Sequence, residues 1–324
     1  MKPATTLVFC LLFFIVAGAY LYLNPEEKPI LHETNAAMQL LPQTAGDEIT
    51  WIQIQKSEKK ETFTLAREGG AWKIKFPVNY PADPLVAEGL ATALRLSSKA
   101  KRLTPAESWE DYGLLTPPIK IGIQTKEMPA RRYLSLGHAS PVGDFVFARW
   151  EKEKDYFLLN ADVKKVFDIS LYSLRQKKMF RTLVPEISEI RVKAGTEPYE
   201  VVKRGGEWFW YRPDPLTNIP IPQPEMDDLL LQFQNLSIKE FLDEEKDLDK
   251  TGIAAKFIQF ELWNESENPE TLVIGKPLDT HDAYYAGLEG ESVVFLVSRN
   301  HVDALLETFQ AMAEAATPKE KPGT

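Results

Sequence analysis

Alternating hydrophobic and polar residues predict β-strands at the start of the first half of the chain. The alternation runs through residues 49–54 and 63–65 and again through 72–76, and a period of two is typical of a half-buried strand. The Gly-Gly pair at 69–70 predicts a tight turn, because glycine takes a positive φ without steric cost. Residues 83–94 combine an Asp-Pro start with hydrophobic residues at helical spacing, which predicts a helix.

The remainder of this half predicts four short strands and a closing helix. Short turns separate the strands, which favours antiparallel pairing and therefore an α+β unit. The strands are expected at residues 119–123, 133–136, 145–148 and 156–159, and the helix at 161–167.

The same landmarks occur a second time along the chain. Residues 68–72, Glu-Gly-Gly-Ala-Trp, recur 136 positions later as Arg-Gly-Gly-Glu-Trp at 204–208. Residues 134–137, Leu-Ser-Leu-Gly, recur 138 positions later as Leu-Val-Ile-Gly at 272–275. Five such landmarks keep their order and drift by only three positions, so duplication is the best explanation.

The chain is therefore predicted to be an α+β protein with two tandem duplicated units of antiparallel sheet plus helices. Unit 1 is expected over residues 47–182 and unit 2 over residues 183–315, followed by a disordered tail at 316–324. In unit 2 the strands are expected at 208–211, 257–262, 271–274, 284–286 and 293–297, and the helices at 226–233 and 302–313.

An apolar segment near the N-terminus predicts a single transmembrane anchor. Residues 7–23 contain no charged side chain, and a spanning helix needs about 20 apolar residues. Lys2 precedes the segment and two glutamates follow it, so the positive-inside rule places residues 1–6 in the cytoplasm. The alternative is a secretory signal cleaved at Ala19, but both interpretations export the rest of the chain, with residues 24–46 as a tether.

Cysteine usage and charge narrow the classes of partner. Cys10 is the only cysteine and lies in the apolar segment, so the exported region forms no disulfide and depends on a packed core. The formal net charge of −9 disfavours nucleic acid and anionic membrane surfaces as partners, since both require a basic patch.

Several motifs, taken in order, resemble a known bacterial family. They are the Gly-Gly-x-Trp turn at 69–72, Asp-Tyr-Gly-Leu at 111–114, the Leu-x-Leu-Gly strand end at 134–137, and Phe-Ala-Arg at 147–149. Together they resemble the domain of unknown function 4340 (DUF4340), over about residues 47–313 and in two copies. The resemblance implies a membrane-anchored extracytoplasmic protein, and some members are associated with ABC-type transporters of the gliding-motility kind. It provides no catalytic residues, and Gly287 replaces the motif arginine in the second copy.

A search for chemistry finds no catalytic or metal-binding motif, so no enzyme activity, cofactor or metal is expected. The four histidines have no metal-ligand spacing, and the acidic stretch at 243–249 lacks the glutamate that an EF-hand requires at its twelfth position. The residues that we single out as a ligand or partner surface are Trp210, Tyr112 and Arg149. For Trp210 a place in the core is the competing interpretation, because Ile74 occupies its position in the first copy.

These observations favour a non-enzymatic accessory or scaffold protein of an envelope transport or assembly complex. The protein is expected to sit in the bacterial inner membrane with its globular region outside the cytoplasm, next to an integral transporter or assembly subunit. The alternative is an extracytoplasmic module that binds a glycan or a peptide, and a hydrolase is a distant third.

Overall fold

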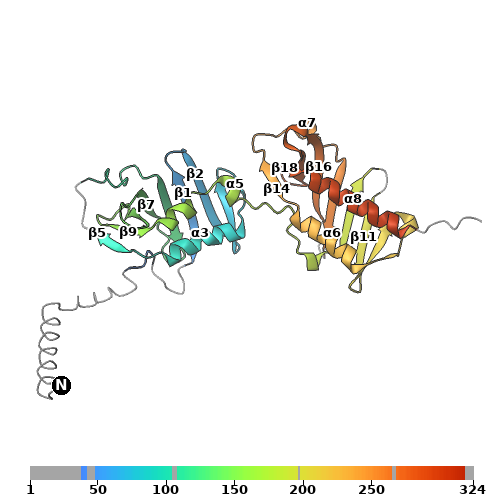
Figure 1. Cartoon of the computed structure of the whole chain (residues 1–324), viewed down its shortest axis with the longest axis horizontal. Coiled ribbons are helices and arrows are strands. Elements are labelled where there is room, and N and C mark those ends of the chain that lie inside the picture. The colour runs from blue at the N-terminus through green and yellow to red at the C-terminus, as the bar shows by residue number, and fades with distance from the viewer. Residues whose placement is uncertain (1–37, 42–47, 104–107, 196–197, 265–267, 318–324) are drawn as a thin grey trace, which may run out of the picture. The chain divides into compact units, whose positions relative to one another are not determined.

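The computed structural model describes residues 38–41, 48–103, 108–195, 198–264 and 268–317 (Figure 1). The predicted anchor at 7–23, the N-terminal residues 1–6 and most of the tail at 316–324 lie outside the described residues. Within these ranges, no helix combines the length and the apolar character that a membrane span needs. Contacts divide the chain into two units between Arg175 and Gln176, and each unit is described by itself.

Unit 1 builds a sheet from strands that alternate between core and surface, with helices after β4 and β9. Its elements are β1 (Ile49–Lys56), β2 (Glu61–Glu68), β3 (Ala71–Phe76), β4 (Tyr80–Pro81), α3 (Pro84–Leu96), β5 (Lys101–Leu103), β6 (Ile119–Thr125), β7 (Arg132–Ala139), β8 (Phe145–Trp150), β9 (Tyr156–Asn160), α4 (Ala161–Phe167) and α5 (Leu171–Leu174).

Unit 2 repeats this string of elements and ends on a longer helix. Its elements are β10 (Glu189–Ala194), β11 (Tyr199–Arg204), β12 (Glu207–Arg212), β13 (Pro220–Ile221), α6 (Gln223–Asn235), β14 (Ile238–Phe241), α7 (Leu248–Thr251), β15 (Ile258–Trp263), β16 (Glu270–Leu278), β17 (Ala283–Leu288), β18 (Val294–Ser298) and α8 (Arg299–Ala316). Three short 3-10 helices complete the described part, at Val184–Glu186, Asp214–Leu216 and Asp279–His281.

The two sheets have the same strand order, which supports duplication. Among the described residues, the nine strands of unit 1 run β4-β3-β2-β1-β6-β7-β8-β9-β5, and those of unit 2 run β13-β12-β11-β10-β15-β16-β17-β18-β14. Neighbouring strands pair antiparallel in both sheets, as the sequence predicts for an α+β unit.

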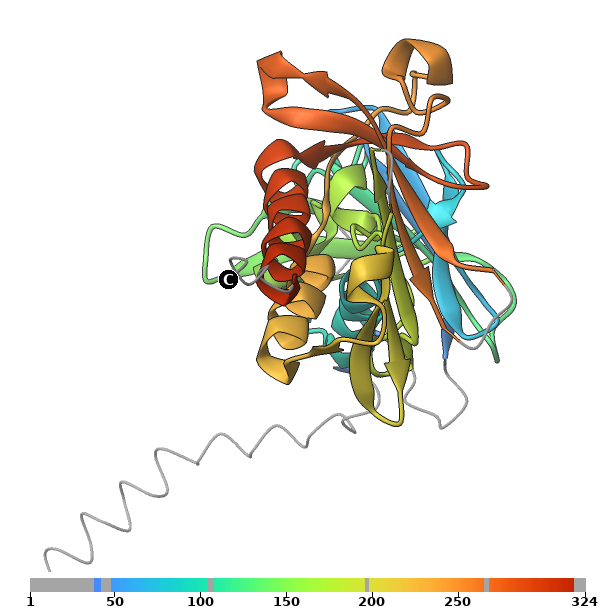
Figure 2. The same cartoon turned by 90° about the vertical axis from the view of Figure 1, so that its right-hand side faces the viewer.

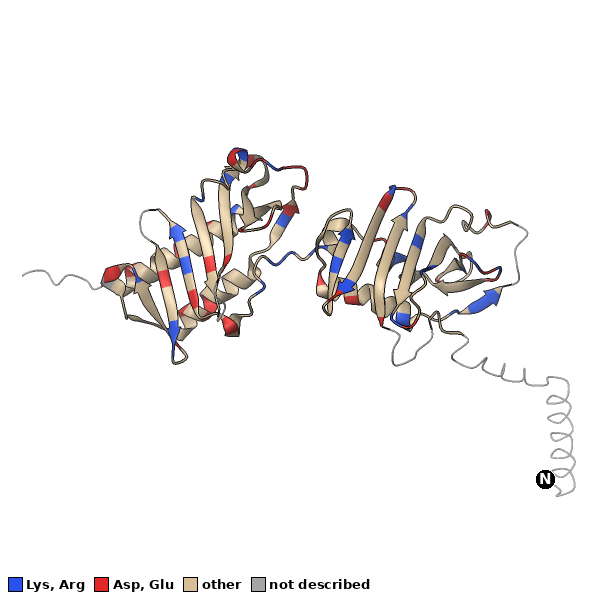
Figure 3. Ribbon diagram, turned by 180° about the vertical axis from the view of Figure 1, so that it is seen from behind, with Lys and Arg blue, Asp and Glu red and all other residues tan. Residues whose placement is uncertain are grey.

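The long helices cover one face of each sheet, and loops cover only part of the opposite face, which we call the open face. In unit 2, α6 and α8 lie side by side on the same face, where α6 contacts β12 and α8 contacts β17 and β18 (Figure 2). In unit 1, α3 contacts β3 and α4 contacts β8 and β9. Figure 3 shows each sheet from the face opposite the long helices, where the strands lie in front.

The core of each unit lies between the sheet and its helices. The predicted core positions Trp72 and Trp208 are both buried, in separate hydrophobic clusters of unit 1 and unit 2. The sequence prediction of the core is therefore confirmed at both tryptophans.

Asp83 caps the predicted helix α3, because its carboxylate accepts hydrogen bonds from the backbone N–H groups of Leu85 and Val86 at 3.1 and 3.2 Å.

The glycine that ends the repeated landmark at 134–137 and 272–275 marks the same close contact in both units. A Cβ on Gly137 would lie 2.1 Å from the carbonyl oxygen of Tyr112, and a Cβ on Gly275 would lie 2.3 Å from that of Thr251. In each unit a loop therefore packs its backbone directly on the strand at this glycine. The repeated sequence landmark thus records a repeated three-dimensional contact.

Three features differ from the prediction. The division between units falls after Arg175, whereas the prediction places it after residue 182. Arg175 belongs to unit 1 because it is buried over the Tyr80 ring. Lys177 belongs to unit 2 because its carbonyl oxygen accepts a hydrogen bond from the backbone N–H of Ile238. The tether expected at 24–46 is partly packed, since Leu40 and Leu41 are buried in the unit 1 core. Several strands were not predicted: the edge strands β5 and β14, which pair with β9 and β18, the strands β10 and β11 of unit 2, and the two-residue strands β4 and β13.

Candidate functional site

The open face of unit 2 carries charged side chains because of the strand alternation. On β10, Ile190 and Val192 point into the core and are fully buried, so Glu189, Arg191 and Lys193 point to the open face. The neighbouring strands contribute Glu200 from β11 and Glu261 from β15, which lie opposite Arg191 in the sheet register. Five charged side chains therefore meet on three adjacent strands.

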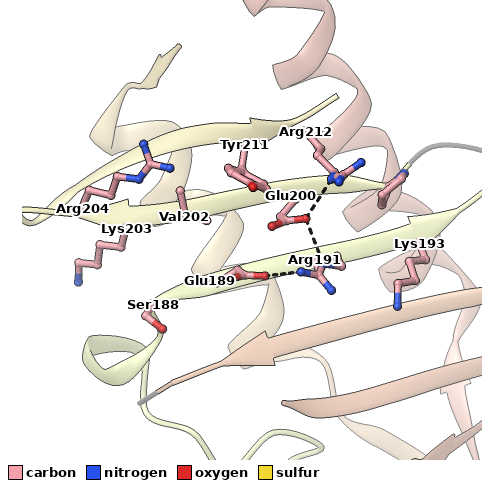
Figure 4. A pocket seen from close by; sticks show the side chains of 11 residues that line it. Ser188, Glu189, Arg191, Lys193, Glu200, Val202, Lys203, Arg204, Tyr211 and Arg212 are labelled. Carbon is pink, nitrogen blue, oxygen red and sulfur yellow. Dashed lines mark hydrogen bonds and ion pairs between the residues drawn. The ribbon is translucent and has the colours of Figure 1, made fainter. Parts of the chain in front are cut away.

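These side chains form one hydrogen-bonded network centred on a single cation. The Arg191 guanidinium donates to the carboxylates of Glu189 at 2.8 Å and Glu200 at 3.1 Å (Figure 4), and to that of Glu261 at 3.5 Å. Lys193 forms a further ion pair with Glu261. Glu200 and Glu261 are only 4% and 5% exposed, so the cations offset charges that would be costly to bury alone.

An open groove of about 640 Å³ lies over this network, and we call it the basic groove. Its lining contains five basic and two acidic side chains, so it is positive in a chain whose net charge is −9. The lining residues are Ser188, Glu189, Arg191, Lys193, Pro198, Glu200, Val202, Lys203, Arg204, Tyr211 and Arg212 (Figure 4).

The pKa shifts in the network follow from burial and charge. Burial raises the pKa of Glu189, and the neighbouring Glu200 carboxylate raises it further, against the opposing effect of Arg191. Burial alone would lower the pKa of Arg191. The hydrogen bond to Glu200 and the negative charges of Glu200, Glu189 and Glu261 outweigh burial and raise this pKa. Arg191 is therefore a permanent cation that is occupied by carboxylates of its own unit.

Unit 1 has neutral residues at the five positions of the charged network of unit 2. Gln53 occupies the position of Arg191, and its amide donates to the Thr64 hydroxyl at 3.3 Å. Gly122 occupies the position of Glu261, and a Cβ there would lie 2.8 Å from the ring of Trp51. The duplicated sheets therefore differ in charge at these matched positions.

The scan against protein-family models returns two matches, at residues 72–256 and 210–321, both to the "Domain of unknown function (DUF4340)". Together they cover more than half of the chain. This chain belongs to the DUF4340 family. The two matches are consistent with tandem copies of the family domain. Neither the curated proteins nor the solved structures contain a match to the chain.

Two of the residues singled out from the DUF4340 motifs, Tyr112 and Arg149, lie in one aromatic cluster of unit 1. The Arg149 guanidinium lies 4.4 Å from the centre of the Trp109 ring, and Trp109 meets the edge of Tyr156 at 5.7 Å between ring centres. Tyr112 packs on Tyr156 at 4.9 Å and on Phe147 at 4.6 Å. Burial, followed by a hydrogen bond with Tyr112, raises the pKa of Tyr156 to about 12.

The second DUF4340 copy has mainly aliphatic residues in place of this cluster. Ile253, Val273 and Val294 are buried together there, with Leu242 and Tyr285 packed against them. The aromatic cluster with its arginine is thus a feature of unit 1, and Tyr112 and Arg149 have no equivalents in unit 2.

The third residue singled out, Trp210, does not belong to an accessible surface. It is 1% exposed and packs in the unit 2 core, where its ring meets the edge of Tyr199 at 6.2 Å between ring centres. Alternation places Trp208 and Trp210 on the same side of β12, and that side faces the helices. Trp210 is therefore a core residue of unit 2 and not part of a ligand or partner surface.

Within the described ranges, no group of three or more His, Cys, Asp or Glu side chains is arranged to hold a metal ion. The acidic stretch at 243–249 is a loop with an ordinary helix start, because Asp247 caps α7 by accepting from the backbone N–H of Lys250 at 2.8 Å. Glu245 pairs with Lys250 in the same loop.

Sequence reasoning missed the basic groove and its network. One signal was present: Glu189, Arg191 and Lys193 are charged at every second position of a short segment, which is the period of one strand face. The partner Glu261 lies 70 positions away from Arg191, so the network becomes recognisable only when the two strands are paired.

Proposed function

We propose that this DUF4340 chain is a non-enzymatic accessory protein that is anchored in a bacterial inner membrane and binds a partner with its exported units. The observation that carries the proposal is the contrast between the two copies. Their strand order is repeated, whereas the positions of the Arg191 network are neutral in unit 1 and charged in unit 2. A change of charge at matched positions of a solvent-facing sheet surface, over a repeated strand order, supports a role in recognition.

The partner is proposed to be an integral subunit of a transport or assembly complex. A single anchor at residues 7–23 provides no pathway for a solute, because a pathway needs several packed spans or a closed barrel. The anchor instead keeps the exported units near integral proteins, and such tethering raises their effective concentration at a binding site.

Cross-linking in intact cells tests this proposal. With a cell-permeable amine-reactive reagent, the full chain is expected to yield an adduct with a multi-span membrane protein. The matched control is the exported region alone, residues 30–324, released by a cleavable signal, which should give at least about tenfold less adduct because tethering is lost. Equal adduct from both forms, or no membrane protein in either adduct, would contradict the proposal.

The second candidate function is a free-standing module that binds a peptide or a glycan. The basic groove favours it, since an open hollow of about 640 Å³ with exposed cations and Tyr211 can hold a polar ligand of that size. This candidate is preferred if the released region retains full biological activity in cells that lack the anchored form.

A further inference from the structure

Four of the five cations of the basic groove fall into two classes, and the fifth, Lys203, lies over the Trp208 ring at 5.9 Å. Arg191 is surrounded by three carboxylates and Lys193 is paired with Glu261, so both serve the network. Arg212 is 51% exposed and forms an ion pair, at 3.6 Å, with the Glu200 carboxylate that Arg191 already holds. Arg204 is exposed and its guanidinium donates to the neutral amide oxygen of Asn218 at 2.8 Å. Arg204 and Arg212 therefore retain positive charge for a ligand.

These two arginines lie at opposite ends of one strand face. Arg204 ends β11, and Arg212 lies opposite Glu200 in the pairing of β11 with β12. The four-residue separation between Glu200 and Arg204 corresponds to roughly 13 Å along a strand. The basic groove therefore presents a cation at each end of a span of that length.

An apolar stretch lies between the two cations. Val202 is midway between Glu200 and Arg204 on β11 and points to the same face, as Figure 4 shows, and the Tyr211 ring from β12 lies beside it. Tyr211 is 41% exposed. An apolar group of a ligand can cover this part of the lining while anionic groups reach the two arginines.

We propose that the basic groove binds an extended peptide with two acidic residues four positions apart and an apolar residue midway between them. In an extended chain, side chains at positions i, i+2 and i+4 point to one side, and the outer two are roughly 13 Å apart. This spacing matches Arg204 and Arg212, and the middle side chain falls on Val202 and Tyr211. Carboxylates also suit the planar guanidinium, which donates paired hydrogen bonds.

An acidic glycan fits the same lining less well. Carbohydrate recognition relies on stacking against aromatic faces, and Tyr211 alone is aromatic among the residues that line the basic groove. The two cations are separated along a strand direction, which a peptide in the same extended conformation matches residue by residue. The observations therefore favour the peptide, and a glycan becomes an outcome of the test.

The inference deepens the proposed function, because it names the chemistry of the partner segment. The probe is the fluorescein-labelled peptide Gly-Glu-Ser-Leu-Ser-Glu-Gly, titrated by fluorescence anisotropy with the full chain in detergent at 0.15 M salt. The matched peptide Gly-Glu-Glu-Leu-Ser-Ser-Gly has the same composition but adjacent glutamates, and it is expected to bind at least about threefold more weakly because it reaches one arginine only.

Variants locate the binding on the protein. Arg204→Gln and Arg212→Gln are each expected to weaken binding about threefold to fivefold, the range for exposed ion pairs. The matched control Lys101→Gln removes an exposed charge from the edge strand β5 of unit 1 and should leave the affinity unchanged. The charge reversal Arg204→Glu should abolish binding. Circular dichroism of each variant checks that it is folded.

Three results would overturn the groove proposal. They are absence of binding at millimolar peptide, equal affinity for the two peptides, and tighter binding of an oligogalacturonate that is lost in the same arginine variants. The last result identifies a glycan site. If the peptide does not bind but the cross-linked adduct still forms in cells, the groove proposal alone is wrong. If the peptide binds but no adduct with a membrane protein forms, the proposed anchored accessory role is wrong.

Discussion

At the scale of single residues, Arg191 determines whether two buried carboxylates of the open face are tolerated. Glu200 and Glu261 are almost fully buried, and Arg191 donates to both. Removal of the cation leaves these carboxylates inadequately paired, and an unsatisfied buried polar group costs more than its hydrogen bond contributes. The equivalent Gln53 of unit 1 holds only neutral groups, so the two units provide a matched comparison.

We therefore expect Arg191→Ala to destabilise unit 2 by about 1–3 kcal/mol in the free energy of unfolding, the cost of leaving buried polar groups unsatisfied. Gln53→Ala removes two hydrogen bonds between neutral groups, one donated to Thr64 and one accepted from Gln55, and should cost less, about 1 kcal/mol. Urea unfolding followed by circular dichroism measures both values. A smaller loss for Arg191→Ala than for Gln53→Ala would contradict the role of the network.

The raised pKa of Glu189 predicts the sign of a pH effect. Because burial and Glu200 raise this pKa above its unfolded value, the folded state binds the proton more tightly, and ionisation of Glu189 disfavours folding as the pH rises through that range. Glu189→Gln removes the ionisation. The unfolding free energy of Glu189→Gln relative to the native chain should therefore increase between pH 4 and pH 7. A relative decrease over this range would show that the pairing with Arg191 outweighs burial.

At the scale of elements, the repeated glycines hold loops against strands. Gly137 and Gly275 each lie under a carbonyl oxygen, at Tyr112 and Thr251. The same contact in both copies explains why the glycine recurs 138 positions apart. It also shows why a sequence landmark can persist where the neighbouring residues have changed, since a side chain of any size would occupy the place of the loop.

Alanine substitutions test this element contact. Gly137→Ala and Gly275→Ala should each destabilise the protein by about 1–3 kcal/mol, because the added methyl group overlaps a carbonyl oxygen and forces the loop away. Gly89→Ala is the control, since that exposed glycine lies within α3 with no atom near its Cβ position, and it should stabilise by about 0.5–1 kcal/mol. Thermal unfolding measures all three, and equal effects would contradict the assigned contact.

Sequence patterns predict most elements because their signals are local. The alternation in β3 and the spacing of Leu90 and Leu94 in α3 arise within one strand or one helix. The edge strands β5 and β14 escape prediction because three or four residues carry little pattern, and their pairing with β9 and β18 is a long-range contact. For the same reason the pattern on β10 does not reveal the Glu261 of β15 that completes its network.

At the scale of the whole molecule, each unit has its own hydrophobic core, with Trp72 in one and Trp208 in the other. The division of the chain after Arg175 separates these cores. Stability is therefore expected to be a property of each unit by itself.

Substitution of either tryptophan should affect one unit only. Trp72→Ala and Trp208→Ala should each cost about 3–5 kcal/mol, the typical loss for truncating a buried aromatic side chain. Hydrogen exchange measured by mass spectrometry should show increased exchange in strands β1–β9 for the first variant and in β10–β18 for the second. Increased exchange across both units in either variant would show that the two cores unfold together.

The most direct test of the central claim, that the charged face of unit 2 binds a membrane partner, is photo-crosslinking at matched positions of the two units in living cells. Benzoylphenylalanine replaces Tyr211 in the basic groove in one strain and Lys75, its equivalent on β3 of unit 1, in the other. Our account predicts an adduct with an integral membrane protein from position 211 and none from position 75. Adducts of equal yield from both positions, or an adduct from position 75 alone, would contradict it.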